Sequence, residues 1–122
     1  MNIKVLAIDD SATMRNLLYA TLSGAGFDVR LAEDGAVGLQ RLAEVVPDVI
    51  VTDINMPNLD GLGFIESVRR NQQKRALPIL VLTTESGSEL KERARKAGAT
   101  GWIVKPFDES KLIGAIERVT AV

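Results

Sequence analysis

Polar side chains follow four apolar runs of the sequence, each at the point where the run ends. The four endings are Asp9 with Asp10, Asp53, Thr83 with Thr84, and Lys105. If the runs are parallel strands of one sheet, these ends lie at the edge where open α/β sheets bind ligands. Carboxylates, hydroxyls and an amine suit a hard cation and the oxygens of a phosphoryl group. The sequence therefore predicts one pocket, with Asp53 at its centre.

The predicted pocket needs positive charge. Three carboxylates about 5 Å apart repel one another by about 3 kcal/mol per pair at an effective dielectric constant of about 20. That repulsion is a large part of the free energy of unfolding of an ordinary domain. Lys105 supplies one positive charge, and the surrounding oxygen atoms favour Mg²⁺ that keeps several of its waters. We therefore expect Mg²⁺ as the cofactor.

The composition narrows both the chemistry and the class of partner. Because the 122 residues include no Cys and no His, thiol catalysis, thiolate zinc sites and histidine general bases are excluded. A net charge of -1, with 15 basic residues scattered along the chain, gives no basic surface for nucleic acid. No apolar run is long enough to span a bilayer, and the N-terminus is unlike a signal peptide. We expect a cytoplasmic protein that enters no membrane and binds no nucleic acid.

Hydrophobic patterning predicts how the polar residues are positioned. Apolar and β-branched runs predict buried strands over 3–8, 27–32, 49–51, 78–84 and 101–104. Apolar residues at helical spacing follow the strands, over 14–22, 37–46, 64–68, 90–97 and 112–119. Such alternation predicts an α/β fold with a parallel sheet, right-handed crossovers and helices on both faces. The length fits one domain, 1–122.

The helix boundaries carry further expectations. Asp10 or Ser11 can cap the first helix, and its apolar face is expected to include Leu17. The apolar face of the second helix is expected to continue to Val46, because Pro47 follows it.

Other segments are expected to be structural or only weakly packed. Asp34 is interpreted as a helix cap or turn residue and Asp60 as a turn residue, and neither as a ligand. Asn71 to Arg75 is predicted to be a polar link between a helix and a strand. The helix around Leu90 has a thin apolar face, so we expect it to be loosely held.

The order and spacing of the polar residues resemble the receiver domains of bacterial two-component response regulators, especially the single-domain CheY-like chemotaxis regulators. The matching residues are Asp9-Asp10, Asp53 with Asn55-Met56-Pro57, Asp60-Gly61, Thr83 and Lys105-Pro106-Phe107. The resemblance covers the whole chain. It implies a flavodoxin-like, doubly wound sheet of five parallel strands in the order 2-1-3-4-5, with five helices.

The resemblance also implies a role for each residue of the pocket. Asp53 would be the phosphorylated nucleophile. Asp10 would bind Mg²⁺ directly, Asp9 would bind it mostly through water, and the backbone carbonyl of Asn55 would be a third protein ligand. Thr83 would donate a hydrogen bond to the phosphoryl group. Lys105 would contact phosphoryl oxygens, aimed inward by a cis peptide bond to the following proline.

Two positions depart from the pattern or modify it. Trp102 stands where the family usually has Tyr or Phe, and an indole is bulkier than a phenol and donates only through its N–H group. We expect Thr83 and Trp102 to form the switch, with a partly buried core aromatic as the alternative for Trp102. Thr84 stands where the family has small residues, so it is expected to affect access to the phosphoryl site.

The implied function is a signalling switch and not an enzyme acting on a separate substrate. A partner histidine kinase would supply phosphate from its phosphohistidine, and a monomer would present a changed surface to a downstream protein, such as the flagellar motor switch in chemotaxis. The chain ends at Val122 without an output domain, so we expect the signal to pass by binding. A phosphate sink, a phosphorelay intermediate and a pseudo-receiver are alternatives. A phosphoaspartate phosphohydrolase is less favoured, because Asn55 stands where that class has its general acid.

Overall fold

Strands and helices alternate along the chain, as the sequence predicts. The computed structural model describes residues 2–71 and 76–121, and within these ranges it has five strands and five helices. In chain order they are β1 (Lys4–Ile8), α1 (Ala12–Gly24), β2 (Asp28–Ala32), α2 (Gly35–Glu44), β3 (Val49–Thr52), α3 (Gly61–Arg70), β4 (Ile79–Thr83), α4 (Ser88–Ala97), β5 (Gly101–Val104) and α5 (Glu109–Thr120).

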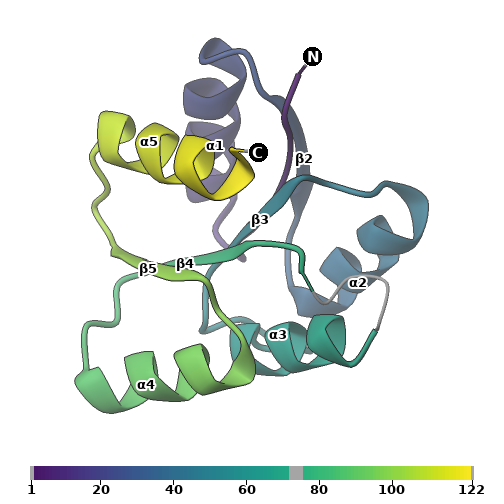
Figure 1. Cartoon of the computed structure of the whole chain (residues 1–122), viewed down its shortest axis with the longest axis vertical. Helices are drawn as coiled ribbons and strands as arrows, with labels where there is room; N and C mark the ends of the chain where they lie inside the picture. The colour runs from purple at the N-terminus through teal and green to yellow at the C-terminus, as the bar shows by residue number, and fades with distance from the viewer. Residues whose placement is uncertain (1, 72–75, 122) are drawn as a thin grey trace.

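The five strands form one parallel sheet in the order β2-β1-β3-β4-β5. In the register, Val5 of β1 lies between Val29 of β2 and Val49 of β3. Helices α1 and α5 cover one face of the sheet, and α2, α3 and α4 cover the other (Figure 1). The predicted flavodoxin-like, doubly wound fold is therefore confirmed.

Two hydrophobic cores form because successive side chains of a buried strand point to opposite faces. Under α1 and α5, the buried core includes Val5, Ala7, Leu18, Leu22, Val51, Leu82, Leu112 and Ile116. Under α2, α3 and α4, it includes Leu6, Ile8, Leu42, Ile50, Phe64, Ile65, Val68 and Val81. All four residues of β3 are buried, so the strand that leads to Asp53 is held on both faces.

Polar side chains mark the starts of four helices. Ser11, Asp34, Asp60 and Asp108 each accept a hydrogen bond from a backbone N–H group in the first turn that follows. The first helix is therefore capped by Ser11 and not by Asp10. The interpretation of Asp34 as a helix cap is confirmed, and Asp60, interpreted as a turn residue, is the N-cap of α3.

Two expected apolar positions are wrong. Leu17 is 46% exposed, because Leu18 and Leu22, four residues apart, define the buried face of α1 and Leu17 lies beside it. Val46 is 70% exposed, because α2 ends at Glu44 and the backbone is already extended at Val45.

Helix α4 has the thin apolar face that the sequence predicts. Its buried residue is Ala94, and its N-terminal Gly87 makes no side-chain cap. At the other end, Nε and Nη2 of Arg69 donate to the Gly98 carbonyl over 3.1 and 2.8 Å, which connects α4 to α3. Of the predicted polar link before β4, residues 72–75 lie outside the described part of the chain.

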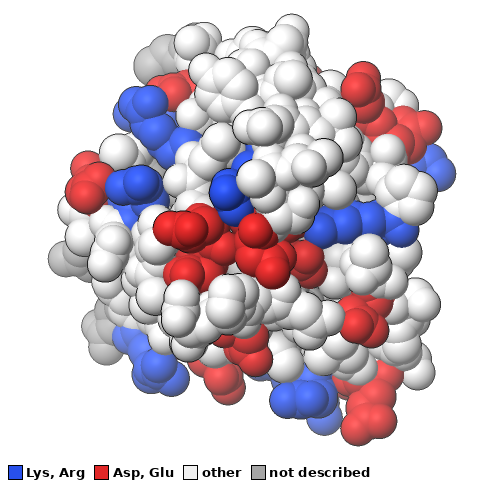
Figure 2. Space-filling model, turned by 180° about the vertical axis from the view of Figure 1, so that it is seen from behind, with Lys and Arg blue, Asp and Glu red and all other residues white. Residues whose placement is uncertain are grey.

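Charge and length give two further facts about the surface and the helices. On the face shown in Figure 2, acidic and basic side chains are interspersed, and several acidic ones gather near its middle. Among the described residues, no helix is both long enough and apolar enough to cross a bilayer.

Candidate functional site

The carboxyl ends of four strands bring the predicted polar residues to one edge of the sheet. Asp9, Asp53 and Lys105 each stand directly after a strand, and Thr83 is the last residue of β4. Backbone hydrogen bonds hold neighbouring ends in line: Asp53 N–H donates to the Ile8 carbonyl over 3.0 Å, and Lys105 N–H donates to the Thr83 carbonyl over 2.8 Å. The predicted convergence of these residues is present in the structure.

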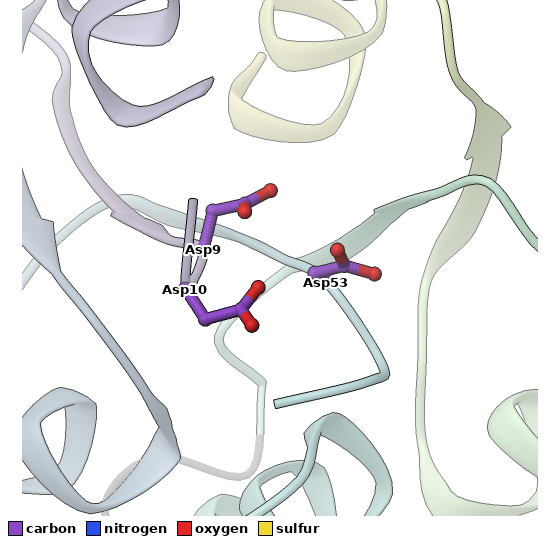
Figure 3. A group of neighbouring side chains, drawn as sticks. All are labelled: Asp9, Asp10 and Asp53. Carbon is purple, nitrogen blue, oxygen red and sulfur yellow. The ribbon is translucent and has the colours of Figure 1, made fainter. Parts of the chain in front are cut away.

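Three carboxylates gather at this edge. Asp9, Asp10 and Asp53 each offer an oxygen atom, and these atoms lie within 4.8 Å of one another (Figure 3). Asp9 is 1% exposed and Asp53 is 9% exposed, whereas Asp10 is open to solvent. The arrangement is an acidic pocket with two buried members and one accessible member.

Lys105 lies between the two buried carboxylates. Its Nζ atom is 2.6 Å from Asp9 Oδ2 and 2.9 Å from Asp53 Oδ2. Burial alone lowers the pKa of Lys105, but the hydrogen bonds to Asp9 and Asp53 and the attraction of their charges outweigh it, so the net pKa is raised. The amine is therefore a cation that offsets the repulsion within the pocket. The Lys105–Pro106 peptide bond is cis.

The other oxygens of the two buried carboxylates have backbone partners. Asp9 Oδ1 accepts from the Ser11 N–H over 2.9 Å, and Asp53 Oδ1 accepts from the Ile54 N–H over 2.6 Å. Each carboxylate is thus oriented with one oxygen on the backbone and the other on Lys105. Arg15 adds a further contact, because its Nη1 donates to the Asp9 carbonyl over 2.7 Å.

Glu85 connects the pocket with the remaining predicted residues. Its side-chain Oε1 accepts from Asn55 Nδ2 over 2.9 Å, and its backbone N–H donates to the buried hydroxyl of Thr83 over 3.3 Å. Its backbone carbonyl accepts from the indole N–H of Trp102 over 3.2 Å. Thr83 and Trp102 are therefore joined through one residue of the loop between β4 and α4, and Thr84 beside them is exposed.

Two residues at this edge were missed by sequence reasoning. Arg15 occupies a helix position that gave no signal of its contact with Asp9. Asn58 has a backbone φ of 67° and donates a side-chain hydrogen bond to Asp34. A possible signal was its place in a turn just after Pro57, because Asn adopts positive φ more readily than most residues.

The chain matches a known family over most of its length. Residues 5–117 match the family described as the response regulator receiver domain. Among curated relatives, chemotaxis protein CheY1 of Helicobacter pylori is 40% identical over 118 residues, which are 95% of each chain. Chemotaxis protein CheY-3 of Vibrio cholerae is 34% identical over 119 residues, which are 97% of this chain and 92% of that protein.

The comparison with solved structures agrees with the family match and the curated relatives. The structure of Vibrio cholerae chemotaxis protein CheY4 superposes with a TM-score of 0.93 and 42% sequence identity, covering 98% of this chain and 99% of that one. Sequence and fold agree along nearly the whole length of both chains. The chain therefore belongs to the response regulator receiver domain family, among its CheY-like members.

Proposed function

We propose that this receiver domain, spanning 1–122, is a signalling switch that accepts a phosphoryl group on Asp53. One observation carries the proposal: Asp53 Oδ2 lies 2.9 Å from Lys105 Nζ, inside a group of three carboxylates. A carboxylate nucleophile next to a fixed cation is suited to phosphoryl transfer, because catalysis of this reaction consists mainly of positioning and charge stabilisation.

We propose Mg²⁺ as the cofactor, and the donor set fits it. The three carboxylate oxygens within 4.8 Å are hard ligands, and the accessible Asp10 leaves a way in for a hydrated ion. Asp10 and Asp53 would hold the ion directly, Asp9 mostly through water, and Asn55 through its backbone carbonyl. When bound, Mg²⁺ neutralises charge on the phosphoryl oxygens and on the entering carboxylate.

In the proposed reaction, an Asp53 carboxylate oxygen attacks the phosphorus of a phosphohistidine. The new bond joins that oxygen to phosphorus as the P–N bond breaks, and the electron pair leaves with the imidazole, which takes up a proton. Lys105, already within 2.9 Å of Asp53, donates to a phosphoryl oxygen. In hydrolysis, water attacks phosphorus, the bond to Asp53 breaks, and inorganic phosphate and the Asp53 carboxylate are released.

The switch is proposed to run from Thr83 to Trp102. The Thr83 hydroxyl is buried and accepts a hydrogen bond from the Glu85 N–H, and the Glu85 carbonyl accepts from Trp102. If the hydroxyl turns to donate to the phosphoryl group, its bond to Glu85 changes, and the indole must adjust its packing. A ligand that favours one of two arrangements in this way shifts their populations.

The partners follow from the chemistry and from the relatives. The 122 residues contain no His, so the phosphohistidine lies outside them, and a histidine kinase is the proposed donor. Two curated relatives carry the name chemotaxis protein, which supports a chemotaxis target such as the flagellar motor switch. The regulator itself is proposed to be monomeric and cytoplasmic.

The test is to mix the purified chain with Mg²⁺ and a small acyl phosphate and to measure its intact mass. The expected result is one added phosphoryl group on the wild type and none when Asp53→Asn is treated in parallel. Omission of Mg²⁺ should prevent the gain. Equal labelling of Asp53→Asn and the wild type would overturn the assignment of the acceptor.

A further inference from the structure

The two ends of the loop from Asp53 to Asp60 pack closely against each other. Gly61 N–H donates to the Ile54 carbonyl over 2.8 Å, so the start of α3 lies directly on the residues after β3. A Cβ atom at Gly61 would lie 2.2 Å from the Asp53 carbonyl oxygen, which shows how little space separates them. The first residue of α3 therefore packs directly against the backbone of Asp53 and restricts its movement.

The far end of the same loop is held by Asp34, which lies 24 residues away in the sequence from Asn58. Asp34 is 4% exposed, and its Oδ2 accepts from Asn58 Nδ2 over 2.7 Å. Its Oδ1 accepts from the Val37 N–H over 2.9 Å and so caps α2. The carboxylate of Asp34 therefore caps α2 with one oxygen and binds Asn58 with the other.

A backbone contact runs beside this side-chain contact. Gly35 N–H donates to the Leu59 carbonyl over 3.1 Å, and a Cβ atom at Gly35 would lie 2.5 Å from that oxygen. Asn58 adopts its left-handed conformation, with φ of 67°, between these contacts. The loop is therefore attached to the N-terminus of α2 by both backbone and side chain.

The opposite side of the loop is attached near β4. Asn55 Nδ2 donates to Glu85 Oε1 over 2.9 Å. The loop is thus attached on two sides. Asn58 binds Asp34, which follows β2, and Asn55 binds Glu85, which follows β4. These two attachments hold the segment from Asn55 to Asn58, and the position of this segment determines where the Asn55 carbonyl lies relative to Asp53.

We propose that Asp34 and Asn58 form a latch that positions this loop for metal binding. The inference rests on the proposed function, since it assumes that Mg²⁺ binds in the pocket of Asp9, Asp10 and Asp53. Asp34 and Asn58 act as positioning residues, because they reach the metal site only through the loop. Partners that orient metal ligands in this way change metal affinity when they are altered.

The test uses Asn58→Asp, which places two carboxylates where the 2.7 Å hydrogen bond now lies. The added negative charge by itself attracts Mg²⁺, whereas loss of the latch weakens binding, so the two effects have opposite signs. We expect Mg²⁺ affinity, measured by calorimetry on the full chain, to fall about tenfold. The matched control is Asn2→Asp, because Asn2 is exposed and precedes β1 at the other end of the sheet.

The rescue is the swapped pair Asp34→Asn with Asn58→Asp. An amide at position 34 still accepts from the Val37 N–H through its oxygen and donates through its nitrogen to the new carboxylate, so cap and latch both return. This pair has the net charge of the wild type and should regain most of the lost affinity. If Asn58→Asp fails to fold, Asn58→Gly removes the amide and accommodates positive φ, and it should weaken Mg²⁺ binding in the same direction.

The latch would be overturned by folded Asn58→Asp that binds Mg²⁺ as tightly as the wild type, or by a swapped pair that recovers no affinity. A wild type that binds no Mg²⁺ would also overturn it. Wild type that binds Mg²⁺ but gains no phosphoryl group would contradict the proposed function instead, and the affinity series would then still support the latch.

Discussion

The indole N–H of Trp102 donates a hydrogen bond to the backbone carbonyl of Glu85 over 3.2 Å. The N–H of that same residue donates to the Thr83 hydroxyl over 3.3 Å. A single residue of the β4–α4 loop therefore touches both the buried hydroxyl next to the pocket and the aromatic ring on β5. Any movement of the Thr83 hydroxyl changes one of these bonds and so acts on the position of the other.

Trp102 should report the switch by fluorescence, since it is the only Trp in the chain. Addition of beryllofluoride with Mg²⁺ is expected to change the emission maximum or the access of a quencher. If a ligand binds one of two states more tightly by a few kcal/mol, a minor state can become the dominant one.

The matched variants for this experiment are Thr83→Ala and Thr84→Ala. Thr84 is exposed, so its loss should leave the fluorescence response in place, whereas loss of the Thr83 hydroxyl should reduce it. Mg²⁺ alone is the control for an effect of the cation. An identical response in Thr83→Ala and the wild type would break the proposed link and leave Trp102 as a core aromatic.

Asp10→Asn should make the metal-free protein more stable and remove the effect of Mg²⁺ on stability. The carboxylate oxygens of Asp9, Asp10 and Asp53 lie within 4.8 Å of one another, and Asp10, the exposed member, repels each of the other two by about 1 kcal/mol at that distance in water. Because the substitution removes both repulsions, urea unfolding with a chelator should show a gain of about 2 kcal/mol. A variant that Mg²⁺ stabilises as much as it stabilises the wild type would contradict this role of Asp10.

Asp34 should contribute stability that depends on pH. The backbone N–H of Val37 and then the amide of Asn58 lower the pKa of Asp34 below its ordinary value of 3.8, so folding favours the ionised form. The contribution is complete above pH 3.8 and is lost as the pH falls through the lower pKa of the folded state.

Asp34→Asn tests this contribution, because Asn caps helices about as well but does not ionise. The urea midpoint of the wild type should exceed that of the variant near neutral pH, and the difference should shrink as acid is added below pH 4. A difference that stays constant from neutral to acid pH would show that ionisation of Asp34 has no part in it.

Gly61→Ala should destabilise the fold by about 1–3 kcal/mol, because the new Cβ meets backbone that cannot move aside. The atoms concerned are the Asp53 carbonyl oxygen at 2.2 Å and Ile54 Cα at 2.8 Å. Gly24→Ala is the control, since nothing lies within 4 Å of its Cβ and it ends α1. That change should be neutral or slightly stabilising in thermal unfolding, and equal losses in both variants would contradict the packing argument.

The fold and the acidic pocket could be predicted because both depend on local patterns. Apolar runs mark the strands, and the polar residue after each run is carried to the same edge by parallel pairing. Asp9, Asp53 and Lys105 therefore meet as expected. The exposed side of α1 was harder to predict, because Leu17 and Leu18 are neighbours and only packing determines which one is buried.

The contacts that hold the loops could not be predicted in the same way. The Asp34–Asn58 hydrogen bond joins residues 24 positions apart and depends on one positive φ angle. The bond from Trp102 to Glu85 depends on where a loop backbone turns, and no side-chain pattern reports that. The sequence therefore indicates which groups reach the pocket, and the structure adds the contacts that hold the neighbouring loops in place.

Chemical mapping of the modified residue distinguishes Asp53 from the other carboxylates of the pocket as the proposed phosphoryl acceptor. The chain, phosphorylated with an acyl phosphate and Mg²⁺, is treated with borohydride, which reduces an aspartyl phosphate to homoserine, and peptides are sequenced by tandem mass spectrometry. Homoserine is expected at position 53 and not at positions 9 and 10. Reduction at another carboxylate while Asp53 stays unchanged would contradict it.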